Sequence, residues 1–131
     1  MIRVDIVTPS RKLVEGAMAQ RVTLPAIKGE IEVLPGHTEL LTLLTTGALV
    51  LFSDGRQTKF AVSHGFVEIR DDRVRVLAET AEEAKEIDRT RAAKAQKNAE
   101  QALSAVLEEG QFRKYQLKLQ RAVVRQQVAQ G

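Results

Sequence analysis

The 131 residues contain no cysteine and no tryptophan. Without cysteine, the chain has no disulfides, no thiolate metal ligands and no cysteine nucleophile. Aromatic residues make up only 4% of the chain, so we expect a core of aliphatic side chains. No stretch approaches the roughly 18 apolar residues of a membrane span. The first seven residues alternate like a strand and show no signal-peptide core. We therefore expect a soluble, most simply cytoplasmic, chain without direct membrane insertion.

Positive charge is concentrated at the end of the sequence. The net charge of +3 is the sum of +5 in residues 110–131, which contain no acid, and −2 in residues 1–109, which contain 15 basic and 17 acidic residues. A basic tail on a nearly neutral body predicts an acidic partner, with phosphate and nucleic acid among the candidates.

The first 79 residues have the patterns of β-strands. Apolar and polar residues alternate with a period of two in residues 2–6 and 73–76. Asp54-Gly55 joins two apolar runs and predicts a tight hairpin, because both central residues of such a turn need positive φ. Further turn signals stand at Pro9-Ser10, Lys28-Gly29, Pro35-Gly36 and Arg70-Asp71-Asp72. Short strands with frequent turns predict an antiparallel sandwich or flattened barrel.

The rest of the chain has helical patterns. Residues 82–107 contain seven alanines and no Gly or Pro, which favours a helix. Gly110 then interrupts, and residues 111–130 form a second helical pattern, so an antiparallel hairpin is predicted. Few large apolar side chains are available to hold the first helix, so we expect marginal docking and two accessible positions. These side chains are Ile87, Leu103, Val106 and Leu107.

Glu30 and His37 lie in the segment GEIEVLPGHTELLTLL, residues 29–44. A glutamate and a histidine within hydrogen-bond reach can perform acid–base catalysis, which makes a small stand-alone enzyme one alternative. The sequence offers no nucleophile, metal-ligand cluster or glycine-rich phosphate loop to accompany the pair. We therefore favour a turn that presents polar groups to a partner. His64, the other histidine, is expected at an ordinary strand or turn position and not in a zinc site.

Four basic residues of the second helix share one face, because their spacing is i, i+4, i+7 and i+11. They are Lys114, Lys118, Arg121 and Arg125. A solvent-exposed face is one interpretation, but such faces usually mix both signs of charge. The absence of acids favours a specific anionic partner. On the first helix, Asp88 and Arg91 also share a face, although Asp88 has the alternative role of a helix-start residue that the helix dipole favours.

The order of these motifs resembles the epsilon subunit family of the F-type ATP synthase over essentially the whole chain. The resemblance rests on VTLPAIKGEIEVLPGHTELLTLL, AVSHGFVEI and RVRVLAETAEEAKEIDRTRA. It implies an α+β fold with an N-terminal antiparallel β-sandwich of about ten short strands, residues 1–81, and a C-terminal two-helix hairpin, residues 82–131. The implied role is non-catalytic: a rotor subunit of the central stalk whose sandwich binds the gamma subunit and the c-ring.

The resemblance also implies a regulatory role for the hairpin. Extended along gamma, it meets the catalytic beta and alpha subunits and restrains ATP hydrolysis, with the basic face of Lys114, Lys118, Arg121 and Arg125 available for the acidic tip of beta. A contact with the polar loops of the c-ring, instead of an active site, is implied for Glu30, Pro35, Gly36 and His37. Glu32 and Glu39 stand where the family mostly has Gly and Pro, which makes this surface more acidic. His64 replaces a family glycine, which leaves open whether its backbone has positive φ.

Some bacterial members of the family bind ATP on the folded hairpin through an Ile/Leu-Asp-x-x-Arg-Ala motif, which stands here as residues 87–92. The resemblance therefore implies a candidate ATP site formed by Glu82, Ile87, Asp88, Arg91, Ala92, Arg121 and Arg125. Carboxylates can accept from adenine or ribose, and arginines bind phosphates bidentately. Asn98 replaces a further arginine of the ATP-binding members, so we expect a weak site. No cofactor is required, and ATP is expected only as a regulatory ligand.

A free nucleic-acid-binding module is a further alternative for the basic helix. It predicts an affinity that falls steeply with salt, and aromatic or base-reading side chains on the basic face. No Asn or aromatic residue lies on that face, so we expect no nucleic-acid partner. Because no transit peptide is visible, a peripheral position on the cytoplasmic side of a bacterial plasma membrane is favoured over a chloroplast location.

Overall fold

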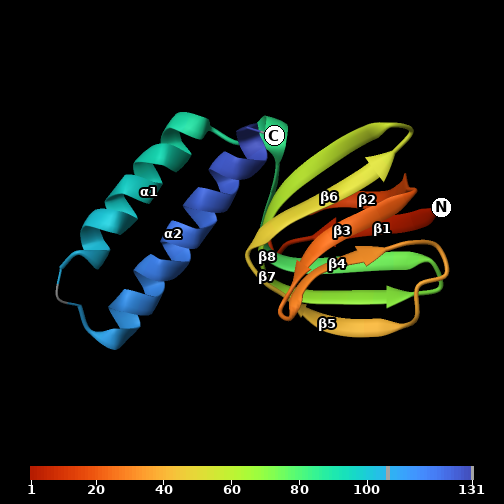
Figure 1. The fold of residues 1–131 in the computed structure, drawn as a ribbon, viewed down its shortest axis with the longest axis horizontal. Helices are drawn as coiled ribbons and strands as arrows, with labels where there is room; N and C mark the ends of the chain where they lie inside the picture. The colour runs from red at the N-terminus through yellow and green to blue at the C-terminus, as the bar shows by residue number, and fades with distance from the viewer. Residues whose placement is uncertain (106, 131) are drawn as a thin grey trace.

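In a computed structural model that describes residues 1–105 and 107–130, a β-sandwich is followed by a hairpin of two helices (Figure 1). The expected order of strands and then helices is confirmed. Val106, expected among the apolar residues of the first helix, lies outside the described residues. The elements are β1 (Ile2–Val7), β2 (Lys12–Ala19), β3 (Arg21–Ala26), β4 (Gly29–Val33), β5 (Leu40–Leu44), β6 (Gly47–Ser53), β7 (Arg56–Arg70), β8 (Arg73–Glu83), the short 3-10 helix η1 (Ala84–Glu86), α1 (Arg89–Leu103) and α2 (Glu109–Gln130). Neither described helix combines the length and apolar character needed to cross a membrane.

The strands form one hydrogen-bonded sheet that folds over into a sandwich. The strand order is β2-β1-β8-β7-β5-β3-β4, and β6 pairs with both β3 and β7. Within the described residues the pairs are antiparallel, except that the first strand, β1, runs parallel to the last, β8. The described residues form eight strands and not about ten, because β7, with 15 residues, and β8, with 11, are each one long continuous strand.

An aliphatic core fills the sandwich, as the low aromatic content predicted. The inward side chains of β1 are completely buried and alternate with polar residues. Each buried aliphatic side chain stabilises the fold by ~1.5–3 kcal/mol relative to an exposed one. The largest fully buried side chains are Ile2, Val4, Ile6, Val22, Leu24, Val33, Leu49, Val62, Val67, Ile69, Val74 and Val76.

The turn chemistry of the sequence is confirmed at two hairpins. Asp54 and Gly55 have φ values of 52° and 75°, as a tight turn between β6 and β7 requires. Asp71 and Asp72, with φ values of 51° and 56°, make the corresponding turn between β7 and β8. Asp tolerates this left-handed conformation better than most residues, because its short side chain can bond the local backbone.

His64 keeps the positive φ that the resemblance left open, with a value of 39°. It lies in β7 where the strand changes partners, since residues 56–62 pair with β6 and residues 65–69 pair with β5. A Cβ added to the next residue, Gly65, would lie 1.8 Å from the carbonyl oxygen of Leu77. Only glycine fits there, so the glycine after His64 is fixed by the close approach of β8.

Two helix boundaries differ from the sequence prediction. Glu82 and Glu83 belong to β8, because they continue its pairing with β7, and this tertiary pairing overrides their helix propensity. The interruption between the helices comes at the residues after Leu103 and not at Gly110, which is the second residue of α2. A glycine inside a helix is about 1 kcal/mol less favourable than alanine, a cost that the 22-residue α2 carries in its first turn.

Candidate functional site

The hairpin contacts the sandwich through α2, while α1 packs on α2 (Figure 1). The interface between the two helices is built from small side chains, and Ala92, Ala99 and Ala122 are at most 3% exposed. Val128 of α2 forms a small second apolar cluster with Ile87 and a sandwich residue. Alanine contacts bury little apolar area, so hydrophobic burial contributes modestly to this docking.

Two arginines of α2 are bound to the sandwich by polar contacts. Arg121 donates from Nε to the buried hydroxyl of Ser63 at 2.8 Å and from Nη2 to Glu79 at 2.9 Å. Arg125 forms an ion pair with Glu82, with 2.6 Å between Nε and the carboxylate. Half of the predicted basic face therefore has anionic partners within the chain, contributed by β8. No local sequence pattern predicts these pairs, because their members lie about forty residues apart.

A third polar contact fixes the segment that leads into the hairpin. Arg11, in the loop after β1, binds Glu86 of η1 with two hydrogen bonds of 2.8 and 3.1 Å and also donates to the carbonyl of Ala81 at 3.2 Å. The hydrogen bond from Arg11 is the main cause that lowers the pKa of Glu86, and a backbone N–H of Glu83 acts in the same direction. The same pairing raises the pKa of Arg11.

A cavity of about 590 Å³ lies between these segments. It brings together all seven residues of the candidate ATP site, which come from β8, α1, α2 and the short segment before α1. Because both helices and the end of β8 contribute walls, the cavity exists only while the hairpin is folded against the sandwich. Its lining consists of Glu82, Glu86, Ile87, Asp88, Arg91, Ala92, Ala95, Asn98, Ala99, Tyr115, Lys118, Arg121 and Arg125.

The charged groups of this cavity are not equally available to a ligand. Asp88 caps α1, since its carboxylate accepts from the backbone N–H of Arg91 at 3.0 Å. This confirms the alternative role of Asp88 and leaves its second oxygen for other contacts. Arg121 and Arg125 already bind carboxylates, as described above. Among the described residues that line the cavity, Arg91 and Lys118 are the cations without a carboxylate partner.

The two lysines of the predicted basic face are both exposed and lie beside Tyr115, so the expectation that no aromatic residue borders this face is wrong. The ammonium groups of Lys114 and Lys118 are 5.9 and 5.2 Å from its ring centre. Such cation–π contacts are weak at exposed positions. Lys118 lines the cavity together with Arg121 and Arg125, whereas Lys114 does not, and only the two arginines form ion pairs with the sandwich.

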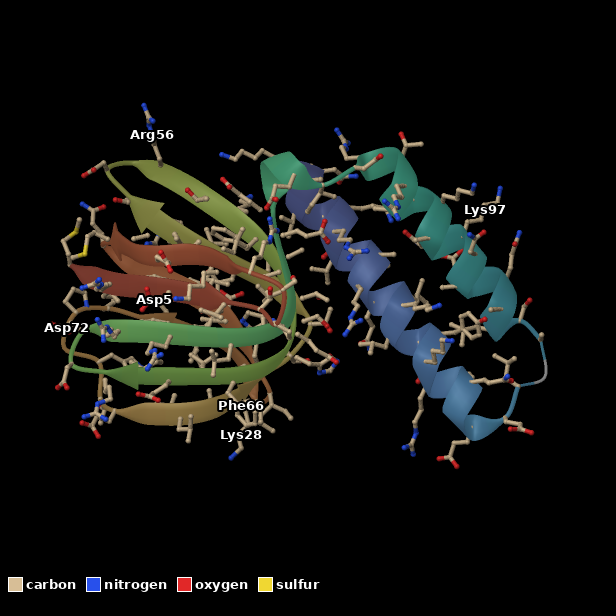
Figure 2. The ribbon with its side chains drawn as sticks, turned by 180° about the vertical axis from the view of Figure 1, so that it is seen from behind. Asp5, Lys28, Arg56, Phe66, Asp72 and Lys97 are labelled. Carbon is tan, nitrogen blue, oxygen red and sulfur yellow. The ribbon has the colours of Figure 1, made fainter. Side chains whose placement is uncertain are left out.

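The residues of the predicted coupling contact are exposed or half-buried but do not form one cluster. Glu30 stands at the start of β4, whereas Pro35, Gly36 and His37 follow its end. The N–H of Gly36 donates to Asp72 at 2.7 Å, which attaches this loop to the β7–β8 turn. Figure 2 shows Asp72 at the end of the sandwich far from the hairpin.

Glu30 and His37 do not form a catalytic pair in this fold. The length of β4 lies between them, at roughly 3.3 Å per residue. The ring nitrogen Nδ1 of His37 instead lies 2.6 Å from the carbonyl of Thr38. Within residues 1–105 and 107–130, no group of His, Asp or Glu side chains is arranged to hold a metal ion.

Two solved structures share this fold. One chain of the mitochondrial ATP synthase of Euglena gracilis, solved as an OSCP/F1/c-ring assembly, superposes with a TM-score of 0.80 at 23% identity over 91% of this chain and 75% of that chain. A chain of the Tetrahymena thermophila mitochondrial ATP synthase central stalk and c-ring gives 0.66 at 12% identity over 98% and 96%. At these identities the likeness shows the fold.

Sequence comparison identifies the family. The ATP synthase, Delta/Epsilon chain, β-sandwich domain matches residues 1–84. The ATP synthase epsilon chain of Trichlorobacter lovleyi is 41% identical over 129 residues, which covers 98% of this chain and 93% of that one. The epsilon chain of Bacillus velezensis is 41% identical over 128 residues, which covers 98% and 96%. The sandwich, the hairpin that follows it and this similarity along nearly the whole length lead to one conclusion: the chain belongs to the epsilon chain family of ATP synthase.

Proposed function

We propose that this chain is a rotor subunit of the central stalk of ATP synthase, and that its hairpin regulates ATP hydrolysis. As an epsilon chain it is a non-catalytic subunit of the complex. The sandwich is the part that binds gamma and the c-ring, with the polar loops of the c-ring meeting Glu30, Pro35, Gly36 and His37. Its place is peripheral, on the cytoplasmic side of a bacterial plasma membrane.

The hairpin is the regulatory part of this proposal. Extended, it presents Lys114, Lys118, Arg121 and Arg125 to acidic groups of the catalytic beta and alpha subunits. To extend, it must first break the contacts of Arg121 and Arg125 with β8. Ion pairs at partly exposed positions contribute roughly 0–1 kcal/mol each, so these contacts can open and reform. The same two arginines then serve both positions of the hairpin.

ATP is the proposed ligand that favours the folded position. The observation that carries this step is the cavity, which gathers Glu82, Asp88 and Arg91 with residues of α2 only in the folded hairpin. A ligand shifts an equilibrium only through different affinities for the two states, and a site with walls from both helices meets that condition. Arg91 and Lys118, which lack carboxylate partners among the described residues, are the proposed phosphate contacts. Asn98 in place of a further arginine is consistent with weak binding.

The size of the effect follows from mass action. ATP at 100 times its dissociation constant stabilises the folded hairpin by ~2.7 kcal/mol. A free-energy change of about 1.4 kcal/mol alters an equilibrium tenfold. Hence a site whose dissociation constant lies well below the ATP concentration shifts a marginal equilibrium, and rising ATP then relieves the restraint on hydrolysis.

The regulatory proposal is tested by adding the chain back to a catalytic head that lacks it. The full chain is expected to slow ATP hydrolysis, whereas a truncation ending at Glu86 keeps the sandwich and should bind without slowing it. If the full chain binds and leaves the rate unchanged, the hairpin is not an inhibitor and the chain serves coupling alone.

The nucleotide step needs a separate test on the isolated chain. Hydrogen exchange in α1 and α2 should slow as ATP is added to the wild type, and Arg91→Ala should remove most of that protection. Lys97→Ala is the matched control, since it removes an exposed cation of the same helix that does not line the cavity. Equal protection of the wild type and Arg91→Ala would rule out the proposed phosphate contact.

A further inference from the structure

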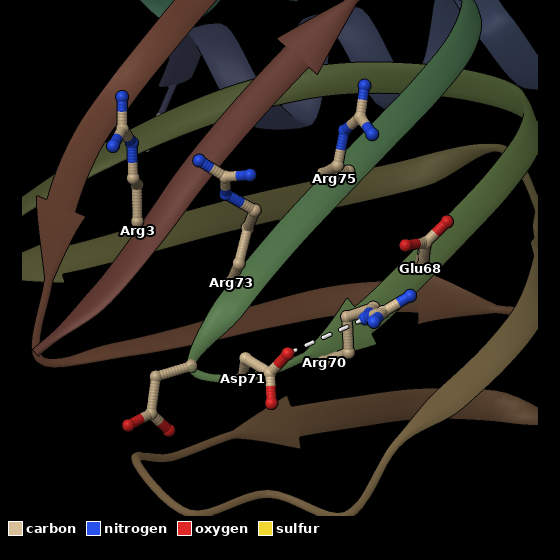
Figure 3. A pocket seen from close by; sticks show the side chains of 7 residues that line it. Arg3, Glu68, Arg70, Asp71, Arg73 and Arg75 are labelled. Carbon is tan, nitrogen blue, oxygen red and sulfur yellow. Dashed lines mark ion pairs between the residues drawn. The ribbon is translucent and has the colours of Figure 1, made fainter.

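Three arginines stand side by side on the outer face of the sandwich, away from the hairpin contacts. Arg70 of β7 is the cross-strand partner of Arg73 in β8, and Arg73 is in turn the partner of Arg3 in β1. Arg75 lies two residues further along β8 on the same face. Figure 3 shows the guanidinium groups of Arg3, Arg73 and Arg75 arrayed along these neighbouring strands. These four residues are named the arginine row below.

The arginine row is costly to the isolated fold. Like charges directly opposite one another in a sheet are destabilising. Arg70 has an ion pair with the adjacent Asp71, at 3.6 Å, but among the described residues Arg3, Arg73 and Arg75 have no ion pair. They border an open concavity of about 430 Å³. Its lining consists of Arg3, Glu68, Arg70, Asp71, Asp72, Arg73 and Arg75.

Three acids of this surface already have partners within the chain. Asp71 forms an ion pair with Arg70, and Asp72 accepts a hydrogen bond from the backbone N–H of Gly36. Asp5, the cross-strand partner of Arg75, accepts from the backbone N–H of Gly16 at 2.6 Å. Glu68, the cross-strand partner of Arg75 on β7, is half-buried like Asp5. Four arginines and three acids line the concavity, a surplus of one positive charge, and among the described residues three of these arginines have no ion pair.

An apolar row lies beside the arginine row on the same sheet face. Leu43, Phe66 and Leu77 are cross-strand neighbours on β5, β7 and β8, and they are 43%, 52% and 49% exposed. Neighbouring large apolar side chains at such exposure mark a surface that a partner covers. Arginine and aromatic residues are enriched at protein interfaces, and an apolar surface next to the charges excludes water from their contacts.

We propose that this face binds an acidic segment of a partner protein, whose carboxylates pair with the arginine row while its apolar side chains cover the apolar row. This inference rests on the proposed function, in which the partner is the gamma subunit. The arginine row then requires negative charge on the segment of gamma that binds here. Arginine suits this role because its planar fork binds a carboxylate bidentately. The adjoining apolar row favours a protein segment over a free anion, which needs no apolar surface.

The test compares two double variants for binding to the gamma subunit from the same organism. Arg3→Gln/Arg73→Gln removes two charges from the row, and Arg56→Gln/Lys97→Gln removes two exposed charges elsewhere (labelled in Figure 2). The first should weaken binding about tenfold at low salt and flatten its salt dependence, whereas the control stays near the wild type. In the isolated chain, the first variant should keep or raise the melting temperature, because a row of like charges is relieved.

Each contrary result has a distinct meaning. If wild type binds gamma and both variants bind equally well, the arginine row has no role at the interface, while the proposed function stands. If the row variant melts earlier and binds less, its role is structural and the inference fails. If vesicles rich in phosphatidylglycerol retain the chain through Arg3 and Arg73 while gamma binding is unchanged, the ligand is a lipid and the inference is overturned. If the wild type does not bind gamma at all, the proposed function itself is wrong.

Discussion

The sandwich and the hairpin are held in opposite ways. Among the described residues, the largest fully buried side chains all belong to the sandwich, in residues 2–76. The buried residues of α1 and α2 are three alanines and Val128. Two arginine–glutamate contacts, made by Arg121 and Arg125, attach the hairpin to the sandwich. A third, made by Arg11, attaches the segment that leads into the hairpin.

This difference predicts that the hairpin opens more easily than the sandwich. Apolar burial of the sandwich type is lost only when the whole domain unfolds, because its side chains interlock across both layers. Ion pairs at partly exposed positions can open one at a time and can be replaced by other anionic partners. The hairpin can thus leave its docked position without loss of the sandwich, which the proposed regulatory role requires.

The largest expected contrast comes from one leucine truncation in each part. Leu24→Ala removes a fully buried side chain of β3 and should lower the free energy of unfolding by about 2–5 kcal/mol. Leu103→Ala removes a half-buried side chain at the end of α1 and should cost roughly 1 kcal/mol or less. Urea unfolding followed by circular dichroism measures both values. Similar costs for the two variants would mean that the hairpin is held as firmly as the core.

The contacts of α2 can be broken without changing its apolar side. Glu79→Gln/Glu82→Gln leaves Arg121 and Arg125 without their carboxylates. Each such pair contributes roughly 0–1 kcal/mol, so hydrogen exchange in α2 should accelerate by up to about tenfold while the strands stay protected. Glu100→Gln, an exposed change on α1 that does not touch these arginines, is the control. Unchanged exchange in the double variant would assign the docking to the alanine contacts.

Local sequence signals predicted much of the sandwich but not the contacts between segments that lie far apart in the chain. The Asp54-Gly55 turn follows from the needs of two adjacent residues, and such chemistry can be read directly from a sequence. In contrast, Glu82 lies in a strand because β7 runs beside it, which no local propensity reveals. Arg121 meets Ser63 and Glu79 only after the chain has folded.

The candidate nucleotide site shows the same division. Its residues were predicted from the family motif at residues 87–92 and from further positions that match the family. The fold brings all of them to one cavity. Their present partners were not predictable, because Arg125 meets Glu82 only when α2 docks. The alternation of Arg73 and Arg75 along one strand can be read from the sequence. Arg3 joins them only because β1 pairs in parallel with β8. Parallel pairing of the first and last strands cannot be inferred from spacing.

A smaller effect is expected from the start of α1. Asp88→Ala removes the carboxylate that caps α1 by accepting from the backbone N–H of Arg91, which should cost ~1 kcal/mol of local helix stability. Asp88→Asn keeps a capping oxygen and should retain most of that stability. Exchange rates of the first turn of α1 compare the two variants. If ATP protects the hairpin of Asp88→Asn less than that of the wild type, the charge of Asp88 also serves the ligand, beyond its capping role.

The smallest expected effect concerns pH and the contact between Arg11 and Glu86. Arg11 lowers the pKa of Glu86 in the folded chain, so the contact favours docking of η1 above the ordinary pKa of a glutamate. That contribution is lost as the pH falls through the lowered pKa, because protonated Glu86 no longer pairs with the guanidinium. The protection factor of amides in the segment after β8, which corrects the exchange rate for its intrinsic pH dependence, should therefore be constant from pH 7 to about 5 and fall only in more acidic solution. Glu86→Gln should remove this acid step and leave the segment slightly looser at neutral pH. A step of the same size in Glu86→Gln would assign the acid sensitivity to the pairs that hold α2, and would place the pH response in the hairpin and not in the segment that leads to it.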